Sequence, residues 1–334
     1  PVLPGTDGPT DRAGAHAFFD GLGPDAAVMV TAVAGGGGRG MRPVFDGDEL
    51  DQALERCASE ASGAFGSGDV YVEALLPRAR HVEVQVLGDG TGAVTQFGDR
   101  DCSVQRHRQK LIEVAPAPGL DQGVRAALTA AAVSMAKELR YRGVGTFEFL
   151  VDLDDPGRWT FMEANPRLQV EHPVTEAVHG VDLVRAQLLV ATGRTLDDLG
   201  LRQGDIRAAH GTAIEARITA ASSGTVKAFD APSGPGVRVD TALHRGAQVS
   251  PRYDSLLVKV VGHVPGGDVR DAARRTARAV AECVIAGIDT NADLLQGVLT
   301  HAEFLAGPVD TGFVERHLPD WAEKGDKVNP TTAE

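Results

Sequence analysis

The sequence contains few cysteines, fewer basic than acidic residues, and no long run of apolar residues. Its three cysteines, Cys57, Cys102 and Cys283, are far apart and odd in number. This usage argues against a disulfide scaffold and favours a reducing compartment. No apolar run approaches the roughly 18–20 residues of a membrane-spanning helix, and no signal peptide is visible at the start of the chain. We therefore expect a cytoplasmic protein with no membrane partner.

Positive charge is in deficit along the chain. Lys and Arg number 33 against 46 Asp and Glu, which gives a formal net charge of −13 at pH 7. Such an acidic chain is a poor partner for nucleic acid or for an anionic membrane. The segment 106–110 is nevertheless locally basic. It could be a solvated loop, but in an acidic chain a site for a small anion is the better interpretation.

A glycine-rich segment, residues 35–40, follows a short apolar strand at 28–30. Consecutive glycines form a loop whose backbone amides can approach a phosphate closely. A flexible linker can look similar. The flanking Arg39, Met41 and Arg42 favour the phosphate interpretation, because a linker would more often carry serine.

Two acidic residues lie at mirror positions around an expected hairpin. The strand-like segments 146–151 and 159–163 flank a turn at 154–157. Glu148 and Glu163 are equidistant from the centre of that turn, so in this register their carboxylates would face each other at about 5 Å. A cation between them would relieve the repulsion, and Mg²⁺ commonly takes carboxylate oxygens together with substrate phosphates. A shifted register, or one glutamate in solvent, would leave no such site.

Polar residues continue beyond Glu163 at every second position. They are Asn165, Arg167, Gln169 and Glu171. If the strand continues, these side chains lie on one face of it. A plain solvated edge would favour Lys, Glu and Thr, whereas a cation, an amide and carboxylates together would suit an oxyanion substrate. Asn165 could also add an oxygen ligand for the metal.

Residues 161–176, which read FMEANPRLQVEHPVTE, resemble the signature of the biotin carboxylases, which are ATP-grasp enzymes. Further segments resemble the same family in the same order. The resemblance extends from residue 1 to about residue 318, whereas the tail 319–334 matches nothing that we can name. The additional segments are 34–42, 80–85, 100–105, 115–119 and 143–149.

The pattern of strands and helices predicts an α+β fold, an antiparallel sheet with helices on one side of it. The resemblance implies the ATP-grasp fold. It divides the chain into a lid subdomain with the glycine loop at 1–65, a core with the metal and bicarbonate sites at 66–210, a biotin carboxylase C-terminal subdomain at 211–318, and the tail. Besides the hairpin, the expected strands are 28–30, 70–73, 81–87, 93–97, 212–219, 236–240 and 256–260, and the expected helices are 49–61, 124–139 and 269–283.

The resemblance implies a reaction in two steps. ATP phosphorylates bicarbonate to carboxyphosphate, and this intermediate, or CO₂ released from it, then carboxylates biotin on a carrier. Glu148, Glu163 and Asn165 correspond to the family's ligands for Mg²⁺ or Mn²⁺, which neutralises charge on the γ-phosphate. Lys110 corresponds to the family's lysine near that phosphate, although a solvated lysine would fit the sequence as well.

The resemblance also implies the substrate residues. Arg167 corresponds to the guanidinium that binds bicarbonate, with Gln169 and the Val170 amide completing the pocket. Glu171 corresponds to the general base. Arg238 corresponds to the residue that stabilises the enolate-like anion of biotin.

The nucleotide-binding residues are implied in the same way. Glu73 and Leu76 correspond to the hinge that contacts adenine. His81 corresponds to a residue near the ribose, although it could also be an ordinary surface residue of a strand. The remaining residues assigned to nucleotide binding are Gly36, Gly37, Gly38 and Gln105.

Several positions depart from the family pattern. Thr31 stands where the family carries a lysine that binds the nucleotide phosphates, and losing such a cation could cost roughly 2–5 kcal/mol of affinity. His107 and Arg108 are exchanged relative to the family order, and Ala74 replaces a basic residue. The family's N-terminal domain and a segment near Ala221 are also absent, which could reflect truncation, disorder or true deletion.

Two interpretations therefore compete. In the first, the chain is the active biotin carboxylase component of an acyl-CoA type carboxylase of fatty acid metabolism. It would work with a biotin carboxyl carrier domain and a carboxyltransferase subunit, as a homodimer or in a larger complex. In the second, it is a non-catalytic or attenuated ATP-grasp domain with a structural role. The intact segment 163–171 favours the first, and it disfavours an ATP-grasp ligase for another substrate.

Overall fold

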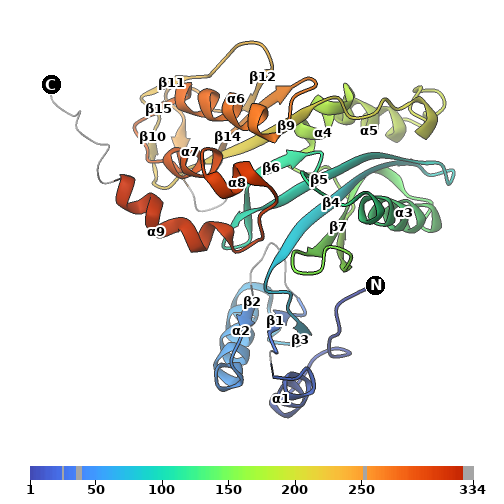
Figure 1. Cartoon of the computed structure of the whole chain (residues 1–334), viewed down its shortest axis with the longest axis vertical. Helices are drawn as coiled ribbons and strands as arrows, with labels where there is room; N and C mark the ends of the chain where they lie inside the picture. The colour runs from blue at the N-terminus through green and yellow to red at the C-terminus, as the bar shows by residue number, and fades with distance from the viewer. Residues whose placement is uncertain (25, 35–39, 251–253, 326–334) are drawn as a thin grey trace.

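The chain folds into a small N-terminal unit and a larger unit, as Figure 1 shows for the computed structural model. The structure describes residues 1–24, 26–34, 40–250 and 254–325. The small unit lies at the bottom of Figure 1, and the long strand β4 (Ala79–Asp89) leads from it into the larger unit.

The small unit is a three-stranded antiparallel sheet with two helices. Its elements are α1 (Arg12–Gly21), β1 (Val28–Ala32), β2 (Met41–Val44), a 3-10 helix (Gly47–Glu49), α2 (Leu50–Phe65) and β3 (Val70–Ala74), with the sheet order β2-β1-β3. α2 forms because its apolar residues, among them Leu50, Leu54 and Ala61, recur so that they make one buried face. It ends at Gly66, whose φ of 79° suits the left-handed conformation of a helix cap.

β3 belongs to this small sheet. It pairs with β1 along its whole length, although the sequence placed residues 70–74 in the core, beyond a boundary at residue 65. The expected strand at 28–30 and the expected helix at 49–61 are confirmed as β1 and α2.

The larger unit is built on an eight-stranded antiparallel sheet. Its strands are, in spatial order, β12 (Val237–Thr241), β14 (Leu256–Val264), β9 (Thr212–Thr219), β6 (Gln109–Ala115), β5 (Val94–Arg106), β4, β7 (Arg142–Asp152) and β8 (Trp159–Asn165). β6 pairs with β9, so the segment expected as a C-terminal subdomain shares one sheet with the core. Two short antiparallel pairs are β10 (Gly224–Thr225) with β13 (Gln248–Val249) and β11 (Ala228–Asp230) with β15 (Val284–Ala286).

Helices cover both faces of this sheet. One face carries α3 (Gln122–Glu138), α6 (Val269–Glu282), α7 (Ala292–Leu299), α8 (Ala302–Ala306) and α9 (Phe313–Gly325). The opposite face carries α4 (His172–His179) and α5 (Leu183–Ala191). α3 begins at Asp121, whose side chain caps the amide of Val124, and it buries residues such as Leu128 and Ala132 against the valines of β4.

The prediction of helices on one side of the sheet is therefore wrong. β4 is buried from Ala79 to Gly88. Its polar residues His81, Glu83 and Gln85 alternate with valines, and that alternation is typical of a strand with one solvated face. Here the polar face is covered as well, and it forms the interior of a candidate site.

The hairpin of β7 and β8 has the predicted register. Glu148 lies opposite Glu163, as their mirror positions around the turn require. Immediately beyond this pair the register shifts, because Phe149 opposes Phe161 and Met162 is an extra residue of β8.

β8 ends at Asn165, so the prediction that its alternation continues to residue 171 is wrong. Pro166 follows, and a proline cannot donate to a neighbouring strand. The chain then leaves the sheet, and Glu171 becomes the residue that precedes α4. Arg167 and Gln169 are therefore presented by a loop and not by a strand.

A bulge in β6 decides where Lys110 points. Ile112 opposes Val104 on β5. Lys110 opposes Gln105, the next residue of β5, so Leu111 is an extra residue on β6. Such a bulge re-aims side chains: Leu111 and Ile112 both pack into the apolar core on one face, and Lys110 lies on the opposite face with the polar residues of β4.

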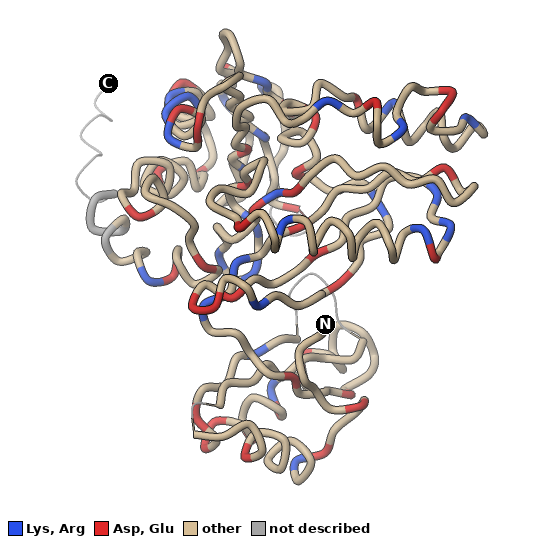
Figure 2. The backbone as a smooth tube through the Cα atoms, turned by 45° about the vertical axis from the view of Figure 1, so that its right-hand side comes forward, with Lys and Arg blue, Asp and Glu red and all other residues tan. Residues whose placement is uncertain are grey.

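Charged residues of both signs lie close together in the middle of the larger unit, as Figure 2 shows. No helix within the described ranges is long and apolar enough to cross a membrane.

Candidate active site

The polar face of the larger sheet carries a buried cluster of charged residues around Lys110. Its ammonium group lies 2.8 Å from Glu83, 3.2 Å from Glu148 and 2.5 Å from Glu171. An ammonium group has three donors, so each carboxylate can take one. Burial alone would lower the pKa of Lys110, but the surrounding carboxylates raise it well above its usual value. Lys110 is therefore a fixed positive charge, and the alternative of a solvated lysine is excluded.

Glu83 is a fixed negative charge in this cluster. It is fully buried between Lys110 and Arg100, whose Nε lies 2.5 Å from its second oxygen. Burial raises the pKa of Glu83, but Arg100 and Lys110 outweigh burial and bring the pKa down to about 2. Arg100 also donates to Gln85 at 2.8 Å and to Thr175 at 2.9 Å. These residues were not among those expected in the site, because a polar alternation such as that of β4 is also typical of a strand with a solvated face.

The three residues expected to bind a metal, Glu148, Glu163 and Asn165, lie together at one edge of the sheet, and we refer to them as the metal group. The Asn165 amide donates to Glu148 at 3.0 Å and to Glu163 at 3.1 Å. After rotation of the amide, all three side chains could offer oxygen atoms to one ion. Oxygen donors are those that Mg²⁺ and Mn²⁺ prefer, so these residues fit a hard divalent cation.

His81 lies behind Glu148 and is buried. Its Nε2 is 2.8 Å from the Glu148 carboxylate, and the Gln105 amide donates to its Nδ1 at 2.8 Å. Because Nδ1 accepts, the ring proton is assigned to Nε2, which faces the carboxylate. Burial would raise the pKa of Glu148, but His81 and Lys110 lower it to about 2. His81 is thus not a surface residue, and its expected place near the ribose stays a prediction.

Arg167 and Gln169 lie next to the metal group, on the loop between β8 and α4. Arg167 donates to Asn165 Oδ1 and to Gln169 Oε1, both at 3.3 Å. Gln169 is buried, and its Nε2 has no hydrogen-bond partner in the part of the chain that the structure describes. A buried donor without a partner is destabilising, and an oxygen of a bound ligand would satisfy it. The arrangement fits an oxyanion beside the metal group.

Glu171 is fully buried just before α4. One of its oxygens contacts Lys110, and the other lies 2.9 Å from Arg217 of β9. Two cations therefore hold this carboxylate in one orientation. Arg217 was not expected in the site. The sequence does contain a sign of its role: Glu215 and Arg217 are charged residues within a mostly apolar strand. Because buried charges need partners, such a pair indicates a buried charged cluster.

Arg238 lies on β12, where it contacts Glu176 of α4 at 2.6 Å and Asp240 at 2.8 Å. These hydrogen bonds raise the pKa of Arg238 above its usual value. Lys259 of β14 donates to the carbonyl of Val170 at 2.9 Å, and it thereby holds the loop that carries Val170.

Two of the residues expected at the nucleotide, Glu73 and Leu76, lie where the two units meet. Glu73 on β3 accepts from the hydroxyl groups of Thr31 and Tyr71, each at 3.4 Å. Burial raises the pKa of Glu73 in spite of these bonds. Leu76 is buried just after β3. The glycines expected in the lid, Gly36, Gly37 and Gly38, lie outside the described residues.

The exchanged residues His107 and Arg108 form the tip of the β5–β6 hairpin, where their φ angles are 49° and 63°. Arg108 reaches the small unit: it donates to the carbonyl of Met41 at 2.8 Å and lies 3.1 Å from the sulfur of Met29. The backbone amide of His107 instead donates to Glu315 of α9 at 2.9 Å. The order of these two residues therefore decides which side chain faces the small unit.

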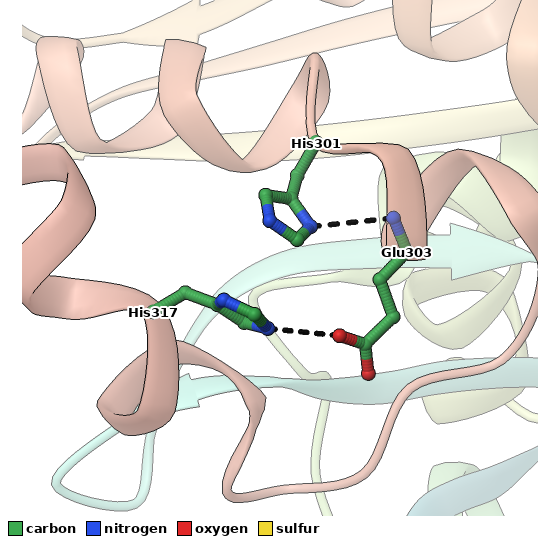
Figure 3. A group of neighbouring side chains, drawn as sticks. All are labelled: His301, Glu303 and His317. Atoms are coloured by element: carbon green, nitrogen blue, oxygen red, sulfur yellow. Dashed lines mark hydrogen bonds and ion pairs between the residues drawn. The ribbon is translucent and has the colours of Figure 1, made fainter.

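A second group of possible metal ligands lies at the junction of α8 and α9 (Figure 3). His301 accepts from the backbone amide of Glu303 at 3.3 Å, and the His317 ring lies 2.8 Å from the Glu303 carboxylate. The two imidazole rings have centroids 4.2 Å apart. These contacts cap α8 and join it to α9, and they explain the group without a metal ion.

Residues 1–199 match the family model of the carbamoyl-phosphate synthase L chain, ATP binding domain, and residues 215–316 match that of the biotin carboxylase C-terminal domain. A biotin carboxylase of Pseudomonas aeruginosa is 45% identical over 327 residues, which cover 95% of this chain and 70% of that protein. The chain belongs to the biotin carboxylase family. The family and the ATP-grasp fold expected from the sequence are thus confirmed.

Other relatives are longer proteins. Human mitochondrial pyruvate carboxylase is 46% identical over 95% of this chain, but this region makes up 27% of its own length. The chain thus spans about a quarter of that relative and about 70% of the bacterial biotin carboxylase.

Solved biotin carboxylase structures have the same fold. The biotin carboxylase domain dimer of Hydrogenobacter thermophilus 2-oxoglutarate carboxylase, in complex with MgADP, ADP and bicarbonate, matches with a TM-score of 0.89 and 36% identity, over 100% of this chain and 72% of that chain. The biotin carboxylase of Campylobacter jejuni, in a nucleotide complex, matches with a TM-score of 0.87 and 38% identity, over 95% and 70% of the two chains.

Proposed function

We propose that this chain catalyses the ATP- and bicarbonate-dependent carboxylation of biotin on a carrier domain. The observation that carries the proposal is the position of Glu171, held by Lys110 and Arg217 beside the loop of Arg167 and Gln169. Buried charges at this density are unfavourable for stability unless they are well paired. A domain with only a structural role would have no catalytic reason to keep them.

In the first step, an oxygen of bicarbonate attacks the γ-phosphorus of ATP, the bond to the bridging oxygen breaks, and ADP leaves. Arg167 and the unpaired amide donor of Gln169 would bind the bicarbonate oxygens. Glu171 would accept the bicarbonate proton, because Lys110 and Arg217 hold its carboxylate close to that loop. Lys110 would stabilise negative charge on the transferred phosphoryl group.

The metal group supports the same step. Glu148, Glu163 and Asn165 would hold Mg²⁺ or Mn²⁺, which supplies positive charge to the nucleotide phosphates. Their position next to Arg167 brings the nucleotide phosphates and bicarbonate to the same edge of the sheet.

In the second step, the carbon–oxygen bond of carboxyphosphate breaks and a carbon–nitrogen bond to the ureido nitrogen of biotin forms. The ureido proton passes to the phosphate that leaves. Biotin becomes an enolate-like anion on this path, and Arg238 would stabilise it. Glu176 and Asp240 hold the Arg238 guanidinium in place for that purpose.

We further propose that the chain acts with a biotin carboxyl carrier domain and a carboxyltransferase, as a homodimer or in a larger complex. The dimer of the Hydrogenobacter domain supports the homodimer. The final acceptor depends on the carboxyltransferase. Relatives include pyruvate carboxylases and a 2-oxoglutarate carboxylase, so the assignment to acyl-CoA carboxylases of fatty acid metabolism stays a prediction.

A non-catalytic or attenuated domain is the alternative, and Thr31 favours it. Its hydroxyl group bonds Glu73, and a hydroxyl group cannot neutralise the charge of a phosphate as a lysine would.

ATP hydrolysis with and without bicarbonate, and with and without free biotin, tests the proposal. We expect hydrolysis that requires bicarbonate and rises with biotin. Glu171→Gln is the matched variant, since it keeps the side-chain volume but cannot accept the proton. If the chain neither hydrolyses ATP nor binds it in a calorimetric titration, the proposal is wrong and the non-catalytic interpretation holds.

A further inference from the structure

Two glutamates in this site have no role in the proposed reaction, Glu113 of β6 and Glu215 of β9. They lie directly opposite each other across the two strands, and both side chains are fully buried. Opposite residues of an antiparallel pair have Cβ atoms about 5 Å apart, and like charges there destabilise the sheet. Two ionised carboxylates at this place would therefore be strongly unfavourable.

Little compensates the charge of these glutamates. Arg217 lies 2.5 Å from Glu113, in an ion pair that is not aligned as a hydrogen bond, and its Nε is 4.0 Å from Glu215. Neither carboxylate has a hydrogen-bond partner within the described ranges. The same guanidinium also pairs with Glu171 at 2.9 Å. One cation thus serves three carboxylates.

The other charged or titratable groups around the two glutamates come from every neighbouring strand on this face and from α4. They are Lys110 of β6, Cys102 of β5, Lys259 of β14, Arg238 and Asp240 of β12, Glu171 just before α4, and His172 and Glu176 of α4. α6 and α7 pack against the opposite face through an apolar core.

The cations in this set are engaged elsewhere. Lys110 contacts three carboxylates of its own. Lys259 pairs with Asp240 at 3.4 Å, and Arg238 pairs with Glu176 and Asp240. In the described part of the chain, Arg217 is therefore the one cation within 4.0 Å of Glu113 or Glu215, although Lys259 also lowers the pKa of Glu215 from outside that distance.

We propose that Glu113 and Glu215 share a single proton, and that this singly charged pair holds Arg217 against Glu171. One acid donates the proton and the other accepts it, which supplies a hydrogen bond to two buried carboxyl groups that otherwise have none in the described ranges. Burial raises the pKa of Glu215 well above its usual value, and the neighbouring Glu113 raises it further. Burial also raises the pKa of Glu113, although Arg217 opposes this shift.

Glu113 and Glu215 are then positioning residues for Glu171. This positioning role rests on the proposed function, whereas the sharing of one proton between the two glutamates is independent of it. When Glu171 accepts a proton, Arg217 still has the negative charge of the pair as its partner and stays in place. When the pair loses its proton at alkaline pH, a second negative charge draws Arg217 away from Glu171. Turnover should therefore fall at alkaline pH.

Infrared difference spectroscopy of the unliganded chain tests the shared proton without turnover, because a protonated carboxyl group has a C=O stretching band separate from those of carboxylates. At neutral pH the wild-type protein should show such a band, and Glu215→Gln and Glu113→Gln should each remove or shift it. Glu282→Gln, at an exposed ion pair of α6, is the matched control and should keep the band. A spectrum in which neither Glu113→Gln nor Glu215→Gln changes such a band would overturn the proposal.

The pH dependence of kcat tests the positioning role. Glu215→Gln keeps a neutral donor next to Glu113, so kcat should fall by about threefold or less and its alkaline decline should disappear. Glu113→Gln removes the anion beside Arg217, so kcat should fall about 10- to 100-fold with little change in KM for ATP. A Glu215→Gln protein with the wild-type alkaline decline would overturn the role. If the wild-type chain shows no bicarbonate-dependent turnover, the proposed function fails, and the infrared band alone decides the shared proton.

Discussion

Replacing Lys110 with methionine removes one charge from the centre of the buried cluster and nearly preserves the side-chain volume. The three carboxylates that lose a partner are Glu83, Glu148 and Glu171. Each of them keeps one basic partner: Glu83 keeps Arg100, Glu148 keeps His81, and Glu171 keeps Arg217. Because every carboxylate keeps one partner, we expect the lower end of the cost of breaking a buried ion pair, about 3 kcal/mol of the free energy of unfolding at neutral pH.

The loss of unfolding free energy caused by Lys110→Met should become smaller as the pH is lowered. In the wild-type protein, the pKa values of Glu83 and Glu148 are lowered from 4.5 to about 2. A lowered pKa contributes stability above the unfolded value, and this stability is lost as the pH falls toward the folded value. Without Lys110 the pKa values rise and the carboxylates take up protons sooner. The stability difference between wild type and Lys110→Met should therefore shrink as the pH is lowered.

Urea unfolding of both proteins, followed by circular dichroism at about pH 7 and about pH 3.5, measures this difference, because the lower pH lies between the usual and the lowered pKa values. Lys137→Met, at an exposed position of α3, is the matched control and should change the free energy of unfolding by less than about 0.5 kcal/mol. A cost below about 1 kcal/mol for Lys110→Met at neutral pH, the range of exposed ion pairs, would refute the reasoning. So would a cost that grows as the pH falls.

Three further changes test other parts of the molecule. Glu171→Gln should abolish biotin carboxylation and leave ATP binding nearly intact, because an amide cannot accept the proton; loss of ATP affinity in a calorimetric titration would mean that Glu171 is misassigned. Glu148→Gln should weaken Mn²⁺ binding by about tenfold or more, measured by electron paramagnetic resonance, and an unchanged affinity would argue against the metal group. Leu128→Ala, in the core under α3, should cost about 2–5 kcal/mol in urea unfolding, and a neutral effect would contradict the packing of α3 on the sheet.

The hairpin with Glu148 and Glu163 was predictable because its information is local. A turn of acidic residues, proline and glycine joins two short strands, and the place of the turn sets which residues oppose each other. The observed pairing of Glu148 with Glu163 follows. The extra residue Met162 left no such signal, since a bulge depends on how the neighbouring strands twist.

Two predictions failed for the same reason. A polar–apolar alternation looks alike in a solvated strand, in a loop beside a site, and in a strand whose polar face is buried against charges. For β8 the decisive local signal was Pro166, which ends the strand. For β4 no local signal existed, because the side chains that contact its buried Glu83 are Arg100 of β5 and Lys110 of β6. Residues of α4 and of the loop before it contact those two cations in turn, from distant parts of the chain.

The sequence by itself determined the family, several of the elements such as β1, α2 and α6, and the neighbourhood of Glu148, Glu163 and Asn165 on one hairpin. Only the tertiary structure decided the surroundings of Lys110, whose three carboxylate partners lie 27, 38 and 61 residues away in the chain. The same holds for Arg217 between Glu171 and the buried glutamates. The physical reason is that a charged side chain becomes a fixed, buried partner only through the elements that cover it, and the residues next to it in sequence do not specify which elements those are.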